Sequence, residues 1–267
     1  MKKLKERYNY SIILLKQLVV TDFKLRYQSS LLGYIWTLLR PLATFMILYL
    51  VFVKFIGVGA GIPNFPVYLL LGLVMWNYFS EVTNGSVGAI VGKGDLIRKI
   101  NFPKYVILFA GSVSALINLA INLFVVLLFA IVTGVDFKSS ALFVPLIVVE
   151  MAVFSVAVGF FLSALFVRFR DVNYIWEVIM QGAFYATPLL YPLNILPASA
   201  AKILMLNPMA QIVQDARYAF VTHDTQTISD VYGTPLIRIV PYGIIAAMLL
   251  ISITYFRKRS RFFAEEV

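Results

Sequence analysis

The chain has 267 residues, of which 61% are hydrophobic and 13% charged, and its mean hydropathy is +0.86. This composition is that of an integral membrane protein. Cysteine is absent and His223 is the single histidine, which excludes a disulfide framework, a thiolate metal site and a cysteine nucleophile. The cations behind the net charge of +10 flank apolar runs, so we assign them to anionic lipid headgroups and expect no nucleic-acid partner.

Residues 8–27 have the pattern of an amphipathic helix lying in the membrane interface. Asp22 and Arg26 fall within its apolar sector, but they stand at i and i+4 and could pair. The apolar side contains Ile12, Leu15, Leu18, Val19 and Phe23, and the polar side contains Lys16, Gln17, Thr21 and Lys24.

Six apolar runs are long enough for transmembrane helices, which need about 20 residues each. They predict an all-α membrane domain at 33–256, between an interfacial N-terminal segment at 1–32 and a tail at 257–267. Arg40 lies just inside the first run, and we expect it to snorkel to the cytoplasmic face. The six runs are residues 33–57, 66–89, 105–133, 142–167, 172–191 and 237–256.

The distribution of lysine and arginine predicts that both termini are cytoplasmic, because cytoplasmic segments retain positive charge during insertion. With the N-terminus inside, 5 of the 23 cations lie outside or near the outer face, and 18 lie on the cytoplasmic side. The five are Lys54, Lys138, Lys202, Arg217 and Arg238. The 18 are Lys2, Lys3, Lys5, Arg7, Lys16, Lys24, Arg26, Arg40, Lys93, Arg98, Lys99, Lys104, Arg168, Arg170, Arg257, Lys258, Arg259 and Arg261.

The cytoplasmic loop between spans two and three contains "LIRKINFPKY" at 96–105. Asp95 and Lys99 stand at i and i+4, and Leu96, Ile97 and Ile100 form a small apolar face, which predicts a short helix ended by Phe102-Pro103. Solvated loops do not usually expose so many apolar residues together, so we expect this helix to dock on a cytoplasmic partner. The alternative is a plain loop of positive charge.

The outer segment between spans five and six is oily and rich in proline. "ATPLLYPLNILP" at 186–197 predicts that the fifth helix breaks near Pro188. Asn207 as N-cap and Pro208 at the first helical position start a further helix. Its apolar residues are Met209, Ile212, Val213, Ala216 and Phe220. We expect short re-entrant helices here, with an ordinary extracellular loop as the alternative.

Two helical stripes are candidates for a translocation pathway, because sugars need aromatic platforms and hydrogen-bonding groups. Both also fit ordinary packing, the second as a hydrogen-bonded seam between helices. The first, in span one, is Phe45, Tyr49 and Phe52, and the second, in span five, is Tyr174, Glu177, Gln181 and Tyr185.

Five motifs, in this order along the chain, resemble the membrane subunit of bacterial ABC exporters of cell-surface polysaccharides, which handle O-antigen, capsule and wall teichoic acid. They are "SLLGYIWTLLRP" at 30–41, "LIRKINFP" at 96–103, "FRDV" at 169–172, "TPLLYP" at 187–192 and "LNP" at 206–208.

The resemblance implies a permease of the bacterial plasma membrane that exports a lipid-linked glycan and works with two copies of a separate ATPase, which binds ATP and Mg. It also implies that the N-terminal helix contacts the ATPase and that the loop helix couples to it. The coupling residues would be Asp95, Leu96, Ile97, Arg98, Lys99, Phe102 and Pro103. Independently, "GKGD" at 92–95 is the nearest approach to a phosphate loop and lacks the required glycine and hydroxyl residue. Hence we expect no ATP hydrolysis and no cofactor on this chain.

Six helices are few for a glycan conduit, so we expect a homodimer about a two-fold axis, which the resemblance also implies. An exporter of another lipid, a secondary transporter and a membrane-embedded transferase are the alternatives. For a secondary transporter, Glu81, Glu150 and Glu177 are scattered without an evident basic partner. For a transferase, His223 is isolated in a polar outer loop, where we expect it to be solvated.

Overall fold

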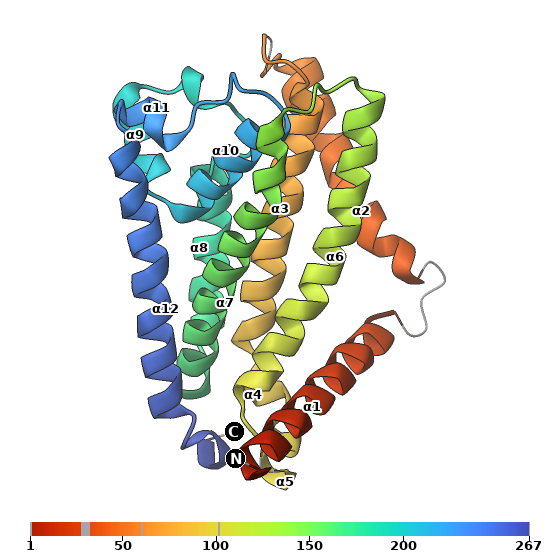
Figure 1. Cartoon of the computed structure of the whole chain (residues 1–267), viewed down its shortest axis with the longest axis vertical. Coiled ribbons are helices and arrows are strands. Elements are labelled where there is room, and N and C mark those ends of the chain that lie inside the picture. Colours follow the sequence, from red (N-terminus) through yellow and green to blue (C-terminus); the bar gives the residue numbers. More distant parts are fainter. Residues whose placement is uncertain (1, 28–32, 60, 101, 267) are drawn as a thin grey trace.

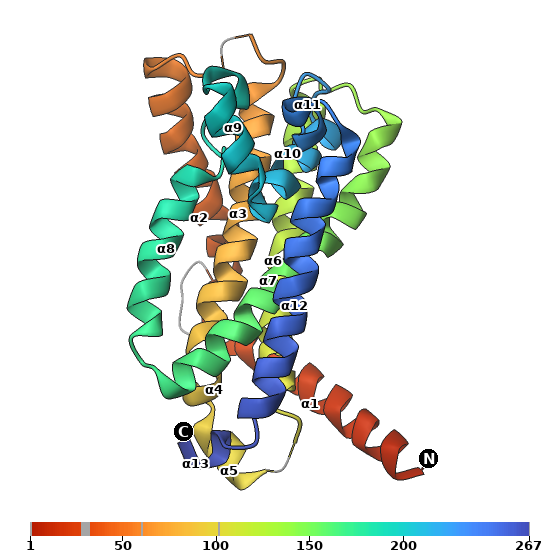
Figure 2. The same ribbon diagram turned by 90° about the vertical axis from the view of Figure 1, so that its left-hand side faces the viewer.

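A computed structural model describes residues 2–27, 33–59, 61–100 and 102–266, and every regular element in these ranges is helical (Figures 1 and 2). Five helical segments there are long and apolar enough to cross a membrane: 36–55, 65–87, 105–132, 139–168 and 235–259. The α-helices are α1 (Lys2–Tyr27), α2 (Trp36–Leu48), α3 (Phe65–Val87), α4 (Ala89–Gly92), α5 (Gly94–Lys99), α6 (Tyr105–Val132), α7 (Val144–Arg168), α8 (Val172–Ala186), α9 (Ala198–Met205), α10 (Pro208–Phe220), α11 (Ile228–Tyr232), α12 (Ile239–Arg259) and α13 (Phe263–Glu266). The 3₁₀ segments are Gly33–Ile35, Ser139–Phe143, Leu193–Ile195 and Pro235–Arg238, and a π-helix covers Tyr49–Phe55.

Helix α3 is the centre of the bundle. It packs against α2, α6, α7, α8 and α10, and its residues 67–76 are buried without interruption. Where α3 crosses α7, Gly159 faces Ser86, and a Cβ at position 159 would collide with that serine. Small residues therefore permit the close approach of these two helices, as is common in membrane bundles.

The first span starts at Trp36 and continues through the π-helix to Phe55. Pro41 lies inside it and has no N–H to donate to the carbonyl of Thr37. Asn122 of α6 supplies a donor instead, with 3.3 Å between its Nδ2 and the Thr37 oxygen. A neighbouring helix thus satisfies the backbone group that the proline leaves open.

The predicted fifth span at 172–191 is a shorter helix than expected. Helix α8 has 15 residues and ends at Ala186, so it is about 22 Å long, whereas the hydrocarbon layer is about 30 Å thick. Thr187 adopts an extended conformation because Pro188 follows it. The predicted break at Pro188 is therefore confirmed, and α8 alone is too short for an untilted crossing.

The loop helix α5 ends at Lys99, earlier than predicted, because Ile100 is already extended. Ile97 and Phe102 are only 4% and 3% exposed. They share an apolar cluster with residues of α1, α12 and α13, which we call the basal cluster and define as Leu18, Ile97, Phe102, Phe256 and Phe263. Both side chains therefore hold α5 onto its own chain, which the sequence pattern did not reveal.

Helix α1 begins at Lys2 and packs along α6. Leu18 is buried and Leu15 and Val19 are partly buried, whereas Lys16 and Lys24 are exposed, as the pattern predicted. Ile12, which was also assigned to the apolar side, is exposed. The side chains of Phe23 and Arg26 lie outside the described part of the chain. Asp22, whose spacing would also allow a pair with Arg26, forms an ion pair with Lys93 at 3.0 Å.

The starts of α1 and α13 lie at the same end of the molecule as α5, and α9, α10 and α11 form a cap at the opposite end (Figures 1 and 2). In that cap Asn207 acts as the predicted N-cap of α10, accepting the Met209 N–H at 3.0 Å. Pro208 begins the helix. Of the predicted apolar face, Met209, Ile212, Val213 and Ala216 are buried and Phe220 partly so.

Candidate functional site: a polar face across four helices

Polar side chains follow one face of the lower half of α3. They are Asn77, Ser80, Glu81 and Asn84, at spacings that place all four on the same side of a helix. Asn77 and Asn84 are exposed, although they lie in a segment that is otherwise apolar and long enough to span a membrane. Exposed amides and carboxylates are unfavourable in lipid, so this face must meet water or protein.

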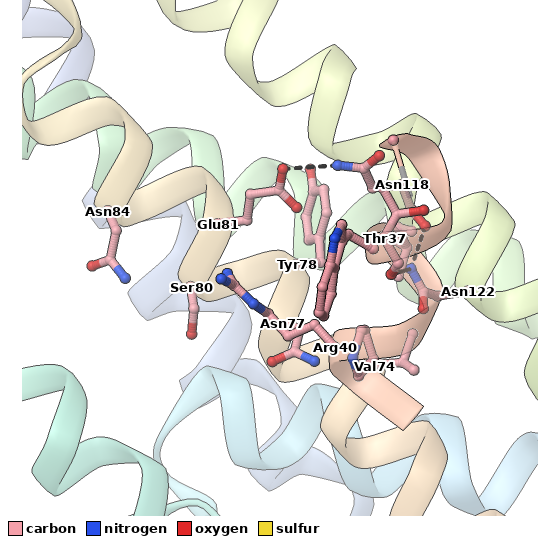
Figure 3. A pocket seen from close by; sticks show the side chains of 14 residues that line it. Thr37, Arg40, Val74, Asn77, Tyr78, Ser80, Glu81, Asn84, Asn118 and Asn122 are labelled. Atoms are coloured by element: carbon pink, nitrogen blue, oxygen red, sulfur yellow. Dashed lines mark hydrogen bonds between the residues drawn. The ribbon is translucent and has the colours of Figure 1, made fainter. Parts of the chain in front are cut away.

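The α3 face forms the floor of a cavity of about 620 Å³, which α2 and α6 also line. In Figure 3, Arg40 from α2 reaches toward Asn77 and Ser80, while Asn118 and Asn122 enter from α6. Arg40 therefore lines this cavity, and its position at the cytoplasmic face stays a prediction.

Hydrogen bonds order the amide side of this cavity. Asn118 Nδ2 donates to Glu81 Oε1 at 2.9 Å, and Asn122 Nδ2 donates to the Asn118 carbonyl at 2.8 Å. The Oδ1 atom of Asn118 is buried and accepts no hydrogen bond from the described residues. The asparagine amides thus position Glu81 at the cavity, while the Asn118 Oδ1 itself is closed to it.

A second cavity, of about 710 Å³, lies between α3 and α8 and shares Ser80 and Asn84 with the first. From the predicted stripe of α8, Glu177, Gln181 and Tyr185 line this cavity, together with Asn173. Tyr174 does not line it. All four members of the stripe are exposed, so within this chain they do not form the buried seam that was the alternative interpretation.

The aromatic stripe of the first span lies elsewhere. Phe45 is buried and meets Phe129 of α6 edge to face, with ring centroids 5.9 Å apart, and its ring lies 5.7 Å from that of Tyr49. Phe52 is partly buried against the same core. None of the three lines either polar cavity.

Arg217 of α10 fixes the turn that follows α8. Its fully buried guanidinium donates to the backbone carbonyls of Tyr68, Pro188 and Leu189. Burial lowers the pKa of Arg217 from its ordinary value. Asn207 adds a bond from its Nδ2 to Thr187 Oγ1 at 3.3 Å. The "TPLLYP" segment is therefore clamped at the outer end of the polar face.

A second polar cluster joins α10 to the start of the last span. Asp215 accepts two hydrogen bonds from the Arg238 guanidinium, at 2.8 and 3.2 Å, and one from Gln211 at 2.6 Å. Burial raises the pKa of Asp215 above its ordinary value, although Arg238 and Gln211 act in the opposite direction. This ion pair ties the outer cap to α12.

His223 is exposed, as predicted, but it is not isolated: it stacks on Tyr218 with ring centroids 4.4 Å apart, and its Nε2 lies 3.0 Å from Ser140 Oγ. Its contacts are those of a packing residue. Among the described residues, no three histidine, cysteine, aspartate or glutamate side chains group as metal ligands would.

The sequence interpretation missed Arg40, Asn77, Ser80, Asn118 and Asn122 as members of the site. The helical spacing that singled out the stripe of α8 also holds on α3, from Asn77 to Asn84, and would have found that part. On α6, Asn118 and Asn122 also stand at i and i+4 and share one side of the helix. Only the packing of α2 and α6 against α3, however, brings them and Arg40 to this site.

A bundle of apolar helices with a polar face running across it is the architecture of a membrane transport protein. Comparison with known proteins specifies the family. The sequence model of the ABC-2 type transporter family matches residues 13–221, and the chain belongs to this family.

Named relatives agree with this assignment. The chain is 30% identical over 265 residues to the O-antigen export system permease protein RfbA of Myxococcus xanthus, which covers 98% of both chains. It is 30% identical over 238 residues to the protein of the same name from Klebsiella pneumoniae, covering 88% of this chain and 91% of that one. The polysialic acid transport protein KpsM of Escherichia coli is 23% identical over 211 residues, covering 78% of this chain and 81% of KpsM.

Proposed function

We propose that this protein is the membrane subunit of an ATP-driven exporter that moves a lipid-linked cell-surface polysaccharide, of the O-antigen, capsule or teichoic acid type, across the bacterial plasma membrane. The main observation is the polar face of two adjoining cavities joined at Ser80 and Asn84. Amides, hydroxyls and aromatic rings are the groups that bind sugars weakly enough to release them. The names of the O-antigen and polysialic acid relatives support a glycan as the substrate.

The proposed topology has six crossings with both termini in the cytoplasm, and the bundle of residues 33–256 acts as one domain. Helix α8 makes the fifth crossing together with residues 187–191, which Arg217 and Asn207 hold at its outer end. In support, α1, α5 and α13 lie at one end of the molecule, where the positive charges of residues 93–104 and 257–261 also lie (Figure 1). A cysteine at Lys99 should react with an impermeant reagent only from the cytoplasmic side.

Coupling to a separate ATPase, which supplies the ATP and Mg site, is proposed for the α5 segment. Asp95, Arg98 and Lys99 are exposed there, so a partner protein can reach their side chains. Leu96 is half-buried, and the buried Ile97 and Phe102 serve as anchors that transmit motion into the basal cluster. Pro103 then redirects the chain into α6.

A homodimer is proposed because the polar face is exposed in the single chain. Glu177 and Gln181 on α8, and Asn77 on α3, would each be costly against lipid. A second copy related by a two-fold axis would enclose the two polar faces around one water-filled pathway. The first-span stripe stays a weaker pathway candidate, since Phe45 is already packed.

Two tyrosines of α8 provide a matched test. Tyr185 lines the second cavity, whereas Tyr174 is exposed to a similar extent, 70% against 66%, and lies off it. We expect Tyr185→Ala and Gln181→Ala to slow export of glycan to the cell surface, measured in cells that depend on this protein, while membrane abundance and ATPase association persist. Tyr174→Ala should have little effect. Equal behaviour of the two tyrosine variants would refute the pathway, and export that persists without ATP would indicate a secondary transporter.

A further inference from the structure

Helix α8 separates two different environments. One side lines the polar cavity, and the other side lines an apolar groove of about 530 Å³ between α8, α7 and α12. Met180 is the only residue of α8 that is buried, so α8 packs loosely against its own chain. Trp176, Ile179 and Ala183 are among the α8 residues that line the groove. The groove is therefore large enough for an extended hydrocarbon chain and chemically suited to one.

The groove ends at the turn between α7 and α8. Leu165 and Val172 line it from the two sides of this turn. Arg168 lies one turn beyond Leu165 on α7, and Arg170 precedes Val172 by two residues. Both arginines are exposed, and the described residues give neither an ion-pair partner. Their guanidinium groups lie over the rings of Phe169 and Phe166, at 5.0 and 5.2 Å from the centroids.

Trp176 provides an independent observation at the same end of the groove. It lies one helical turn above Val172, and it lines the groove. Tryptophan near a helix end commonly sits at the level of the lipid headgroups and esters. Trp176, which lines the groove, is thus consistent with a headgroup level at this end of the groove.

From these features we infer that the α7–α8 corner is a binding site for an anionic phospholipid of the cytoplasmic leaflet. Arg168 and Arg170 bind its phosphate, and one acyl chain lies in the groove behind α8, against the Trp176 ring. The orientation of this site rests on the topology proposed above. The lipid would support α8 from behind while the opposite side of the helix faces the polar cavity.

The net charge of the turn between α7 and α8 predicts how strongly the site prefers an anionic headgroup to a zwitterionic one. Two arginines and Asp171 give a net charge of +1, worth about 1 kcal/mol or roughly fivefold in favour of an anionic over a zwitterionic headgroup. Arg168→Gln or Arg170→Gln should abolish this preference. Asp171→Asn should increase it, again by roughly fivefold.

Fluorescence quenching of Trp176 by lipids with brominated acyl chains tests the proposal in proteoliposomes of the full chain. Trp36→Phe and Trp76→Phe leave Trp176 as the only one of the three tryptophans. If Trp76→Phe impairs folding, the difference between the parent protein and Trp176→Phe gives the same signal. We expect brominated phosphatidylglycerol to quench at about one fifth of the mole fraction that brominated phosphatidylcholine needs.

Filling the groove provides the matched control. Ala183 lines it, whereas Ala186 is exposed on the same helix and lies off it. Ala183→Phe should therefore reduce the quenching, and Ala186→Phe should not.

Equal quenching by lipids with the two headgroups would mean contact with bulk lipid only and would overturn the proposal. Loss of quenching when a polyprenyl phosphate is added would assign the groove to a lipid carrier instead. The assay needs neither ATP nor glycan, so its result is separable from that of the export test.

Discussion

Arg217 lies against Tyr68, with its guanidinium carbon 3.7 Å from the centre of the tyrosine ring and its Nε donating to the tyrosine carbonyl at 3.0 Å. This contact joins α10 of the outer cap to the central helix α3. The same guanidinium holds the carbonyls of Pro188 and Leu189. The end of α8 and the outer end of α3 are thus fixed to each other through one side chain.

Replacing this arginine should destabilise the protein strongly. Arg217→Lys keeps the charge but cannot reach several carbonyls at once, so we expect a loss of about 3 kcal/mol or more in the free energy of unfolding. Tyr68→Phe retains the ring and loses one hydrogen bond to Gln214, worth about 1 kcal/mol. Thermal unfolding in detergent compares the two. Similar melting temperatures for both variants would show that Arg217 is not the main clamp.

Gly72 should be intolerant of a side chain for the same reason. A Cβ at this position would collide with the Arg217 guanidinium, whereas one at Gly85, on the same helix, would meet nothing within 4 Å. Gly72→Ala should therefore cost about 1–3 kcal/mol of stability. Gly85→Ala should be neutral or slightly stabilising, because alanine favours helix. The same thermal assay checks both, and an unaffected Gly72→Ala protein would contradict the packing described.

Substitutions in the α5 segment should distinguish residues that anchor the helix to its own chain from residues that dock the ATPase. Ile97 is buried, so Ile97→Ala should lower stability by about 2–4 kcal/mol. Lys99 is exposed, so Lys99→Glu should leave thermal stability within about 0.5 kcal/mol but weaken co-purification of the ATPase. Full retention of the ATPase by Lys99→Glu and Arg98→Glu variants would argue against a docking role for this surface.

The ion pair between Asp22 and Lys93 should contribute little by itself. Both side chains are more than a quarter exposed, so its worth after solvent screening is about 0.2–1 kcal/mol. Asp22→Lys alone should weaken the contact of α1 with the α4–α5 loop, and the exchange Asp22→Lys with Lys93→Asp should restore it. A double-mutant cycle on thermal stability at low and high salt measures this coupling. A coupling energy that does not fall with salt would contradict the exposed geometry.

Asp215 should make stability depend on pH. Its pKa is higher in the folded protein than its ordinary value of 3.8, so the folded state holds the proton more tightly than the unfolded state does. The contribution of this tighter proton binding to the free energy of unfolding is complete below the ordinary pKa. It is lost as pH rises through the pKa of the folded state. The stability of the wild type relative to Asp215→Asn should therefore fall as pH rises from about 4. Asp224→Asn, at an exposed position, serves as the control, and identical profiles for the two variants would contradict this linkage.

Features that depend on neighbouring residues alone could be predicted from the sequence. Apolar length located the spans, since a run either covers the hydrocarbon layer or does not. Pro188 ended α8 because the residue before a proline avoids helical geometry, and Asn207 with Pro208 began α10 by local capping. The α8 stripe was recognisable because helical periodicity places its members on one side.

Contacts between distant segments were decided only by the tertiary structure. Ile97 and Phe102 look like exposed apolar residues in a loop, and only the packing of distant helices, among them α1, α12 and α13, buries them. Arg217 and Tyr68 are 149 positions apart, and Glu81 and Asn118 are 37 apart. No local pattern specifies which helix faces which, because apolar helices are interchangeable in hydrophobicity and differ only in the shapes and polar groups that their packing brings together. The sequence by itself therefore determined an all-helical membrane protein and its breaks, while the polar face and its clamp exist only because α2, α6, α8 and α10 assemble around α3.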